Sequence, residues 1–173
     1  IRDIGVTGVQ TCALPISADQ RERLVAALAD TAAAARETLA RPDADEAARV
    51  AAVGLVGWQE EHVSADLERL ADVVAPTAPP AVAAAAIDRL ARIAGPRAGA
   101  ILVERCGAVG PALGSQAVGA LLARDEWSRL LLDHVVADPR LGGLLDAARR
   151  QQLLRHRVPE IRQTAEKLFS GMA

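Results

Sequence analysis

Proline and glycine divide this chain into short apolar segments, and each segment has the spacing of an amphipathic helix. Breaks fall at the proline run of residues 76–80, at Gly95-Pro96 and at Gly110-Pro111. Hydrophobic residues make up 51% of the chain and aromatic residues only 2%, so the apolar content is mostly Ala, Leu and Val, a composition that favours helices. The sequence therefore predicts an all-α fold built from helix–turn–helix units.

The expected helices lie between these proline and glycine breaks. The first has Leu24, Val25, Leu28 and Ala32 at helical spacing, and Asp43 or Asp45 can cap the second. The uncharged stretch 106–123 is broken by Gly110-Pro111, so it predicts two soluble helices and no membrane segment. The expected ranges are about 19–39, 43 or 45 to 57, 64 to the proline run, 80–94, 111–123, 125–136, 144–156 and 159–169. A further helix, which carries Ile101, Leu102 and Val103, is expected between the Gly95-Pro96 and Gly110-Pro111 breaks.

A repeated pattern appears in the second helix of each pair, where an aliphatic residue is followed four positions later by Ala. The alanines are Ala52, Ala86, Ala117 and Ala165, at spacings of 34, 31 and 48 residues. Hairpins of the first two lengths cannot bury their apolar face alone, so they stack, with Ala at the closest helix contacts. The pattern favours a short α-solenoid of about four hairpins. An ordinary irregular helical bundle is the alternative.

The helix that begins at Val158-Pro159 has Ile161-Arg162 ahead of Ala165, and it resembles the second helix of a HEAT repeat. The runs ALLARDEWSRLLLDHV and LLDAARRQQLLRHRVPEIRQTAEKLF are similar to the HEAT-like segment of large planctomycete-type exported proteins. In that family, a sorbosone-dehydrogenase-like propeller precedes the repeats and a c-type cytochrome domain follows them. The resemblance implies a non-catalytic, exported or periplasmic scaffold that joins those domains, with the neighbouring domains or another protein as its partners.

Covalent attachment of c-type haem uses Cys-x-x-Cys-His, whereas Cys106 is followed here by Gly-Ala-Val. We therefore expect no cofactor and no enzymatic activity in this segment, and the resemblance places haem in the domain that would follow. Residues 1–16, IRDIGVTGVQTCALPI, resemble a translated sequencing adapter. The expected domain is residues 17–173, a fragment of a larger protein, and residues 1–16 should make few contacts.

No single residue indicates a reaction centre. Cys106 has no cation close to it in the sequence that could activate it, so we expect a buried structural thiol. We expect Trp58 and Trp127 to fill gaps between adjacent hairpins, with an interface role as the alternative. The remaining candidates are His62, His134 and His156, which lack metal-ligand spacing, and Glu60-Glu61-His62, which predicts a solvated turn.

The one local excess of positive charge lies near the C-terminus, and it predicts a solvated helix face or, alternatively, an interaction face. Its members are Arg149, Arg150, Arg155, His156, Arg157, Arg162 and Lys167. An isoelectric point of about 5.9 makes nucleic acid an unlikely partner, because nucleic-acid-binding domains are usually basic. A free-standing binding protein or nucleic-acid-acting enzyme that uses this face is the alternative function.

Overall fold

The computed structural model describes residues 17–170, and every regular element in this part of the chain is a helix. The all-α prediction is confirmed. The helices are α1 (Ala18–Ala40), α2 (Glu46–Leu55), α3 (Val63–Val73), α4 (Pro80–Arg92), α5 (Pro96–Cys106), α6 (Pro111–Leu121), α7 (Asp125–Ala137), α8 (Ala147–Leu154) and α9 (Pro159–Ser170), with 3₁₀ turns η1 (Glu60–His62) and η2 (Pro139–Leu144). The prediction for residues 1–16 lies outside the described residues.

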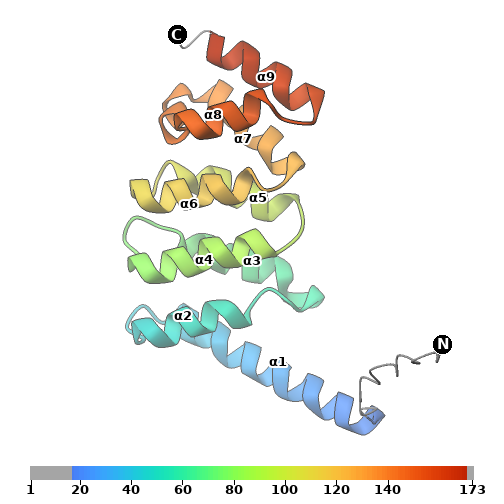
Figure 1. Cartoon of the computed structure of the whole chain (residues 1–173). Coiled ribbons are helices and arrows are strands. Elements are labelled where there is room, and N and C mark those ends of the chain that lie inside the picture. The colour runs from blue at the N-terminus through green and yellow to red at the C-terminus, as the bar shows by residue number, and fades with distance from the viewer. Residues whose placement is uncertain (1–16, 171–173) are drawn as a thin grey trace, which may run out of the picture.

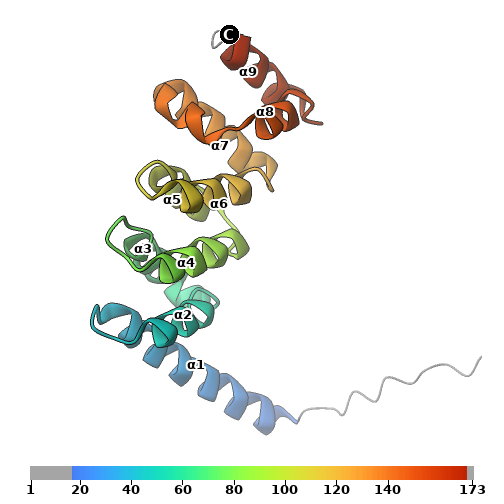
Figure 2. The same cartoon turned by 60° about the vertical axis from the view of Figure 1, so that its left-hand side comes forward.

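The helices form a stack of antiparallel hairpins that rises from α1 to α9 (Figure 1). The regular hairpins are α1–α2, α3–α4 and α5–α6, and in the last unit α9 packs on both α7 and α8, so the stack has about the four units that the sequence predicts. Helices α1, α3, α5, α7 and α9 pack in sequence along one layer, and α2, α4 and α6 pack along the other. Figure 2 shows the same stack from a second direction, with α1 and α9 at its opposite ends. This arrangement is a short α-solenoid.

The helix boundaries follow the caps that the sequence supplies. Asp45 rather than Asp43 caps α2, since its carboxylate accepts a hydrogen bond of 3.1 Å from the Ala48 N–H. Pro80, Pro96 and Pro111 are the first residues of α4, α5 and α6, as the sequence predicts.

The helix expected over 144–156 is shorter than predicted and begins later. The Asp146 carboxylate accepts a hydrogen bond of 2.8 Å from the Arg149 N–H and so caps α8 at Ala147. The preceding residues form the 3₁₀ turn η2 instead, where Asp138 caps the first turn. The last unit of the stack, from α7 to α9, is therefore irregular.

All four repeat alanines are buried: Ala52 is 4% exposed, and Ala86, Ala117 and Ala165 are fully buried. The first three lie in α2, α4 and α6, which stack directly on one another. Ala165 lies in α9, which packs on α8 and α7, so it does not continue the α2–α4–α6 series directly. The pattern of an aliphatic residue followed by Ala marks any close helix contact, so it cannot distinguish the two layers.

A single apolar core extends from Ala35 to Ala165 through the described part of the chain. Two glycines allow helices to approach closely. A Cβ on Gly114 would lie 2.6 Å from the Cys106 carbonyl oxygen, and a Cβ on Gly99 would lie 2.5 Å from the Trp127 ring. Trp127 is 2% exposed and fills the space between successive units, as predicted.

Two groups of apolar side chains are more exposed than the sequence analysis suggests. Trp58 is 45% exposed in the α2–α3 connection, so it does not plug a gap between hairpins. Leu24, Val25 and Leu28 are 45–53% exposed, although Ala32 on the same stripe is buried. The reason is length, since α1 has 23 residues and its partner α2 has 10, too few to cover both halves of α1.

Candidate functional site

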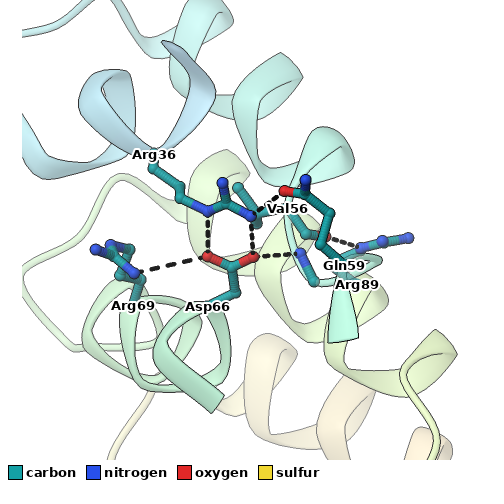
Figure 3. A network of polar contacts seen from close by, with 7 residues as sticks. Arg36, Val56, Gln59, Asp66, Arg69 and Arg89 are labelled. Atoms are coloured by element: carbon teal, nitrogen blue, oxygen red, sulfur yellow. Dashed lines mark hydrogen bonds and ion pairs between the residues drawn. The ribbon is translucent and has the colours of Figure 1, made fainter. Parts of the chain in front are cut away.

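The most developed polar site in the described residues is a buried network at the junction of the first and second hairpins (Figure 3). Its centre is Asp66 in α3, which is fully buried. The Arg36 guanidinium of α1 donates to both carboxylate oxygens, through Nε at 2.7 Å and through a terminal nitrogen at 3.0 Å. The Gly57 N–H donates a third bond of 2.8 Å. Three separate elements therefore meet on one carboxylate.

The α2–α3 connection completes the network. Gly57 has a φ of 79°, a conformation that glycine adopts without strain, and the chain turns there as it leaves α2. Gln59 is 8% exposed, and its side-chain oxygen accepts a bond of 2.6 Å from Arg36. Arg69 lies 3.6 Å from the Asp66 carboxylate. The network therefore ties α1, α3 and the segment between α2 and α3 together.

The electrostatics of the network favour the ionised pair. Burial alone would raise the pKa of the Asp66 carboxyl, but hydrogen bonds from Arg36 and Gly57 and the charges of Arg36 and Arg69 lower the pKa below its ordinary value. The hydrogen bond to Asp66 raises the pKa of Arg36. With its acceptor atoms occupied by protein donors, Asp66 is suited to holding helices together rather than to moving protons.

Arg89 of α4 joins the first two hairpins at a second point. Its Nε donates a bond of 2.7 Å to the carbonyl oxygen of Val56, the C-terminal capping residue of α2. Carbonyls at a helix C-terminus have no partner within the helix, and a cation there also interacts favourably with the helix dipole. Burial and the nearby Arg92 charge lower the pKa of Arg89.

Links of the same kind recur up the stack at separations of one repeat. In each, a side chain donates to a backbone carbonyl of the preceding hairpin, 32 to 34 residues earlier in the sequence. The further pairs are Gln116 with Ala84 at 3.1 Å, Arg124 with Ala91 at 2.9 Å, Trp127 with Gly95 at 3.3 Å, and Arg149 with Ser115 at 2.7 Å. Arg124 also lies over the Trp127 ring, 4.3 Å from its centroid.

The basic residues of the candidate interaction face are mostly engaged within the chain. Arg155, Arg157 and Lys167 are exposed; Arg155 lies within hydrogen-bonding distance of the Gln151 amide, and Arg157 pairs with Asp125 at 2.5 Å. The other arginines bond to the backbone: Arg149 to the Leu144 and Ser115 carbonyls, Arg150 to those of Leu145 and Gly142, and Arg162 to that of His156. The sequence excess of positive charge therefore does not form one open basic surface.

The remaining candidate residues from the sequence lie in separate parts of the structure. The Cys106 thiol is fully buried, its Sγ lies 3.2 Å from the Val103 carbonyl oxygen, and burial raises its pKa. Glu60, Glu61 and His62 form the turn η1. His156 accepts a bond from the Val158 N–H through Nδ1.

An open groove of about 500 Å³ lies between α5, α7 and η2. Its polar side chains include Glu104, His134, Asp138 and Arg140. Asp138 and Arg140 pair with each other at 2.9 Å, and Glu104 bonds to Arg97 at 3.2 Å. These pairs neutralise most of the charge that a ligand in the groove would encounter.

Within residues 17–170, no group of three or more His, Cys, Asp or Glu side chains could hold a metal ion. Among the helices described, none is both long and apolar enough to cross a membrane. Comparison with known proteins finds no family model, no curated protein and no solved structure that matches this chain. The function of this chain must therefore be inferred from its own residues.

Sequence reasoning missed Asp66, Arg36 and the chain of arginine-to-carbonyl links. The donors at positions 89, 116, 124 and 149 lie 32 to 34 residues after their acceptors, but two of those acceptors, Ala84 and Ser115, lie within helices, so no helix end in the sequence marks these links. The sequence does contain one signal, a carboxylate at Asp66 directly before the apolar stripe Leu67, Leu70 and Ala71, which must be buried.

Proposed function

We propose that this chain is a HEAT-like helical-repeat scaffold that holds whatever is attached to its two ends at a fixed separation. The observation that carries the proposal is the series of side-chain links between successive hairpins, from Arg89 in α4 to Arg149 in α8. A solenoid bends at the contacts between its repeats, so polar bonds added to the apolar contacts there limit bending.

The family resemblance gives the proposal a more specific form. In it, the scaffold separates a sugar-dehydrogenase-like propeller from a c-type cytochrome domain in an exported protein. The scaffold contributes positioning, and the chemistry, including haem, belongs to the attached domains. The buried polar groups support this division, because Asp66 and Arg36 use their hydrogen-bonding capacity on each other and on the backbone.

A distance measurement between the two ends tests the scaffold proposal. Spin labels are placed at Asp43, in the α1–α2 loop, and at Gln163, on α9, because both positions are exposed. The Cys12→Ser substitution removes a thiol that would compete for the label. Cys106 can stay because it is fully buried. We expect electron–electron double resonance to give one narrow distance distribution, centred on the separation of these sites in the structure. A broad or two-component distribution would overturn the proposal of a fixed spacer.

The alternative of a nucleic-acid-acting protein has less support, since most of the C-terminal arginines bond within the chain. Fluorescence anisotropy with a duplex DNA at low salt tests it, and we expect no binding. Salt-sensitive binding that Arg155→Glu with Lys167→Glu abolishes would favour the alternative, because both side chains are exposed and their replacement leaves the fold intact.

A further inference from the structure

The groove between α5, α7 and η2 exists because the last unit of the stack is irregular. Residues 107–110 suffice to connect α5 to α6, whereas α7 and α8 are connected by residues 138–146. The longer connection folds into η2, and its Leu141 and Leu144 form one wall of the groove. Insertions in repeat proteins lie on one face of the stack, and that face is often the one that binds a ligand.

Most of the groove wall is apolar. Val103, Gly107 and Ala108, from the end of α5 and the residues after it, lie opposite the two leucines of η2. The groove has a volume of about 500 Å³, within the usual range of small-molecule sites. Such sites combine apolar walls with a few polar groups that orient the ligand. The polar groups of this groove therefore decide which ligand it can take.

His134 of α7 contributes a hydrogen-bond acceptor. Its Nδ1 lies 3.2 Å from the Leu130 carbonyl oxygen, one turn earlier in the helix. A carbonyl oxygen only accepts, so Nδ1 donates, and in the neutral ring Nε2 is left without a hydrogen. Within residues 17–170, this Nε2 has no hydrogen-bond partner.

Glu104 of α5 contributes a carboxylate with acceptor capacity to spare. Arg97 uses two nitrogens on the Glu68 carboxylate, at 2.9 and 3.1 Å, and gives Glu104 a single bond of 3.2 Å. A carboxylate can accept about four hydrogen bonds. Glu104 can therefore accept further donors from a ligand while it stays paired with Arg97.

The rest of the groove adds no free positive charge. Arg140 donates to both carboxylate oxygens of Asp138, at 2.9 and 3.0 Å, so these two side chains neutralise each other. Helices α5 and α7 both end at the groove, and a helix C-terminus carries a partial negative charge. Arg105, the basic residue in the last turn of α5, is not among the residues that line the groove.

We infer that this groove binds a primary alkylammonium group, with the ammonium between His134 and Glu104 and the alkyl chain along Leu141 and Leu144. A primary ammonium has three N–H donors and no acceptor, so it matches a site whose free polar groups are both acceptors. A carboxylate or phosphate would instead meet the Glu104 carboxylate and the two negative helix ends. The ammonium can belong to a free amine or to a lysine side chain.

Nuclear magnetic resonance titration of the full chain with n-butylammonium chloride, at neutral pH and constant ionic strength, tests the inference. We expect the backbone amide signals of Gly107, Ala108 and Leu141 to shift in a saturable way, with a dissociation constant of about 1–10 mM. 1-Butanol, which has the same alkyl chain without the charge, should bind at least about tenfold more weakly. A lysine with both backbone ends blocked separates the two sources: binding like butylammonium assigns a lysine side chain, and no binding assigns a free amine.

Two variants locate the ammonium. Glu104→Gln should weaken butylammonium binding by about threefold or more. Glu68→Gln is the matched control, because Glu68 pairs with the same Arg97 and is similarly exposed, but lies in α3 outside the groove. His134→Phe removes the acceptor and keeps a ring of similar shape, so it should also weaken binding, while circular dichroism should match the native chain.

Four outcomes would overturn the inference. They are no saturable shift up to about 50 mM butylammonium, ten times the middle of the expected range of dissociation constants; 1-butanol binding as well as butylammonium; Glu104→Gln binding like the native chain; and Glu68→Gln weakening binding as much as Glu104→Gln. None of them bears on the distance between the two ends of the chain, so this inference and the scaffold proposal can fail independently.

Discussion

Replacing Asp66 by Asn should destabilise the fold by about 3–5 kcal/mol, the usual cost of removing one partner from a buried ion pair. The carboxylate accepts three hydrogen bonds, two from Arg36 and one from the Gly57 N–H, and it is fully buried. Asn keeps the shape but replaces one acceptor oxygen with a donor, which then opposes an N–H group. The Arg36 side chain, only 12% exposed, would keep its charge without a counter-ion.

Urea unfolding followed by circular dichroism measures this loss as a shift in the free energy of unfolding. Fluorescence of Trp58 adds a local readout because it adjoins Gln59, a member of the network. Asp72→Asn is the matched control: it makes the same charge change on the exposed face of α3 and should stay within about 0.5 kcal/mol of the native chain. A loss below about 1 kcal/mol for Asp66→Asn would refute the reasoning.

The pair should also be coupled. Arg36→Met removes the cation that Asp66→Asn leaves unpaired, so the double variant should lose less stability than the sum of the two single losses. Residues in one ion-pair network show interaction energies of about 0.5–3 kcal/mol. Additive losses would mean that Arg36 and Asp66 stabilise the chain independently, contrary to the geometry.

The lowered pKa of Asp66 predicts a particular dependence on pH. A carboxyl whose folded-state pKa lies below its unfolded value contributes stability above the unfolded pKa and loses it as the pH falls through the folded pKa. The difference in unfolding free energy between the native chain and Asp66→Asn should therefore be constant from about pH 8 to 5 and shrink below about pH 4. A difference that stays constant into strong acid would contradict this account.

Three further predictions concern packing. Gly114→Ala should cost about 1–3 kcal/mol, because its Cβ would lie 2.6 Å from a backbone carbonyl oxygen, while Gly54→Ala, with open space around it, should gain up to about 1 kcal/mol in the same urea assay. In a Cys12→Ser chain, Cys106 should react with a thiol-specific disulfide reagent only as fast as the protein opens; fast labelling would show that the thiol is accessible. Trp127→Phe should cost about 1–3 kcal/mol through a lost hydrogen bond and an unfilled gap, and an unchanged melting curve would argue against its role as a plug.

Much of the fold could be predicted from local signals. Prolines at the first turns of α4, α5 and α6 fixed where those helices begin, since proline fits a first turn and disrupts an interior. The alanine spacing of about one hairpin predicted the stacked second layer. Such features depend on residues that are close together in the sequence, so they can be recognised without knowing which helices pack against one another.

The errors concern contacts between distant segments. Ala165 has the same local pattern as Ala117, and only the packing of α9 on α7 and α8 shows that it does not continue the series of α2, α4 and α6 directly. The Asp66 network joins residues 30 positions apart, and nothing local to Arg36 specifies its partner. From the sequence alone, the C-terminal arginines could be expected to bind a ligand. In the fold they donate to backbone carbonyls, and the sequence does not show which carbonyls lie near a given side chain.

Small-angle X-ray scattering from residues 17–173, at dilutions where the chain is monomeric, most directly tests whether the hairpins form one extended stack. A compact globular chain of this length has a radius of gyration of about 15 Å. The stack predicts a clearly larger value, an asymmetric pair-distance distribution with a long tail, and a curve that fits the structure without adjustment. A value near 15 Å with a symmetric distribution would show that the helices collapse into a compact bundle, and the scaffold account would be wrong.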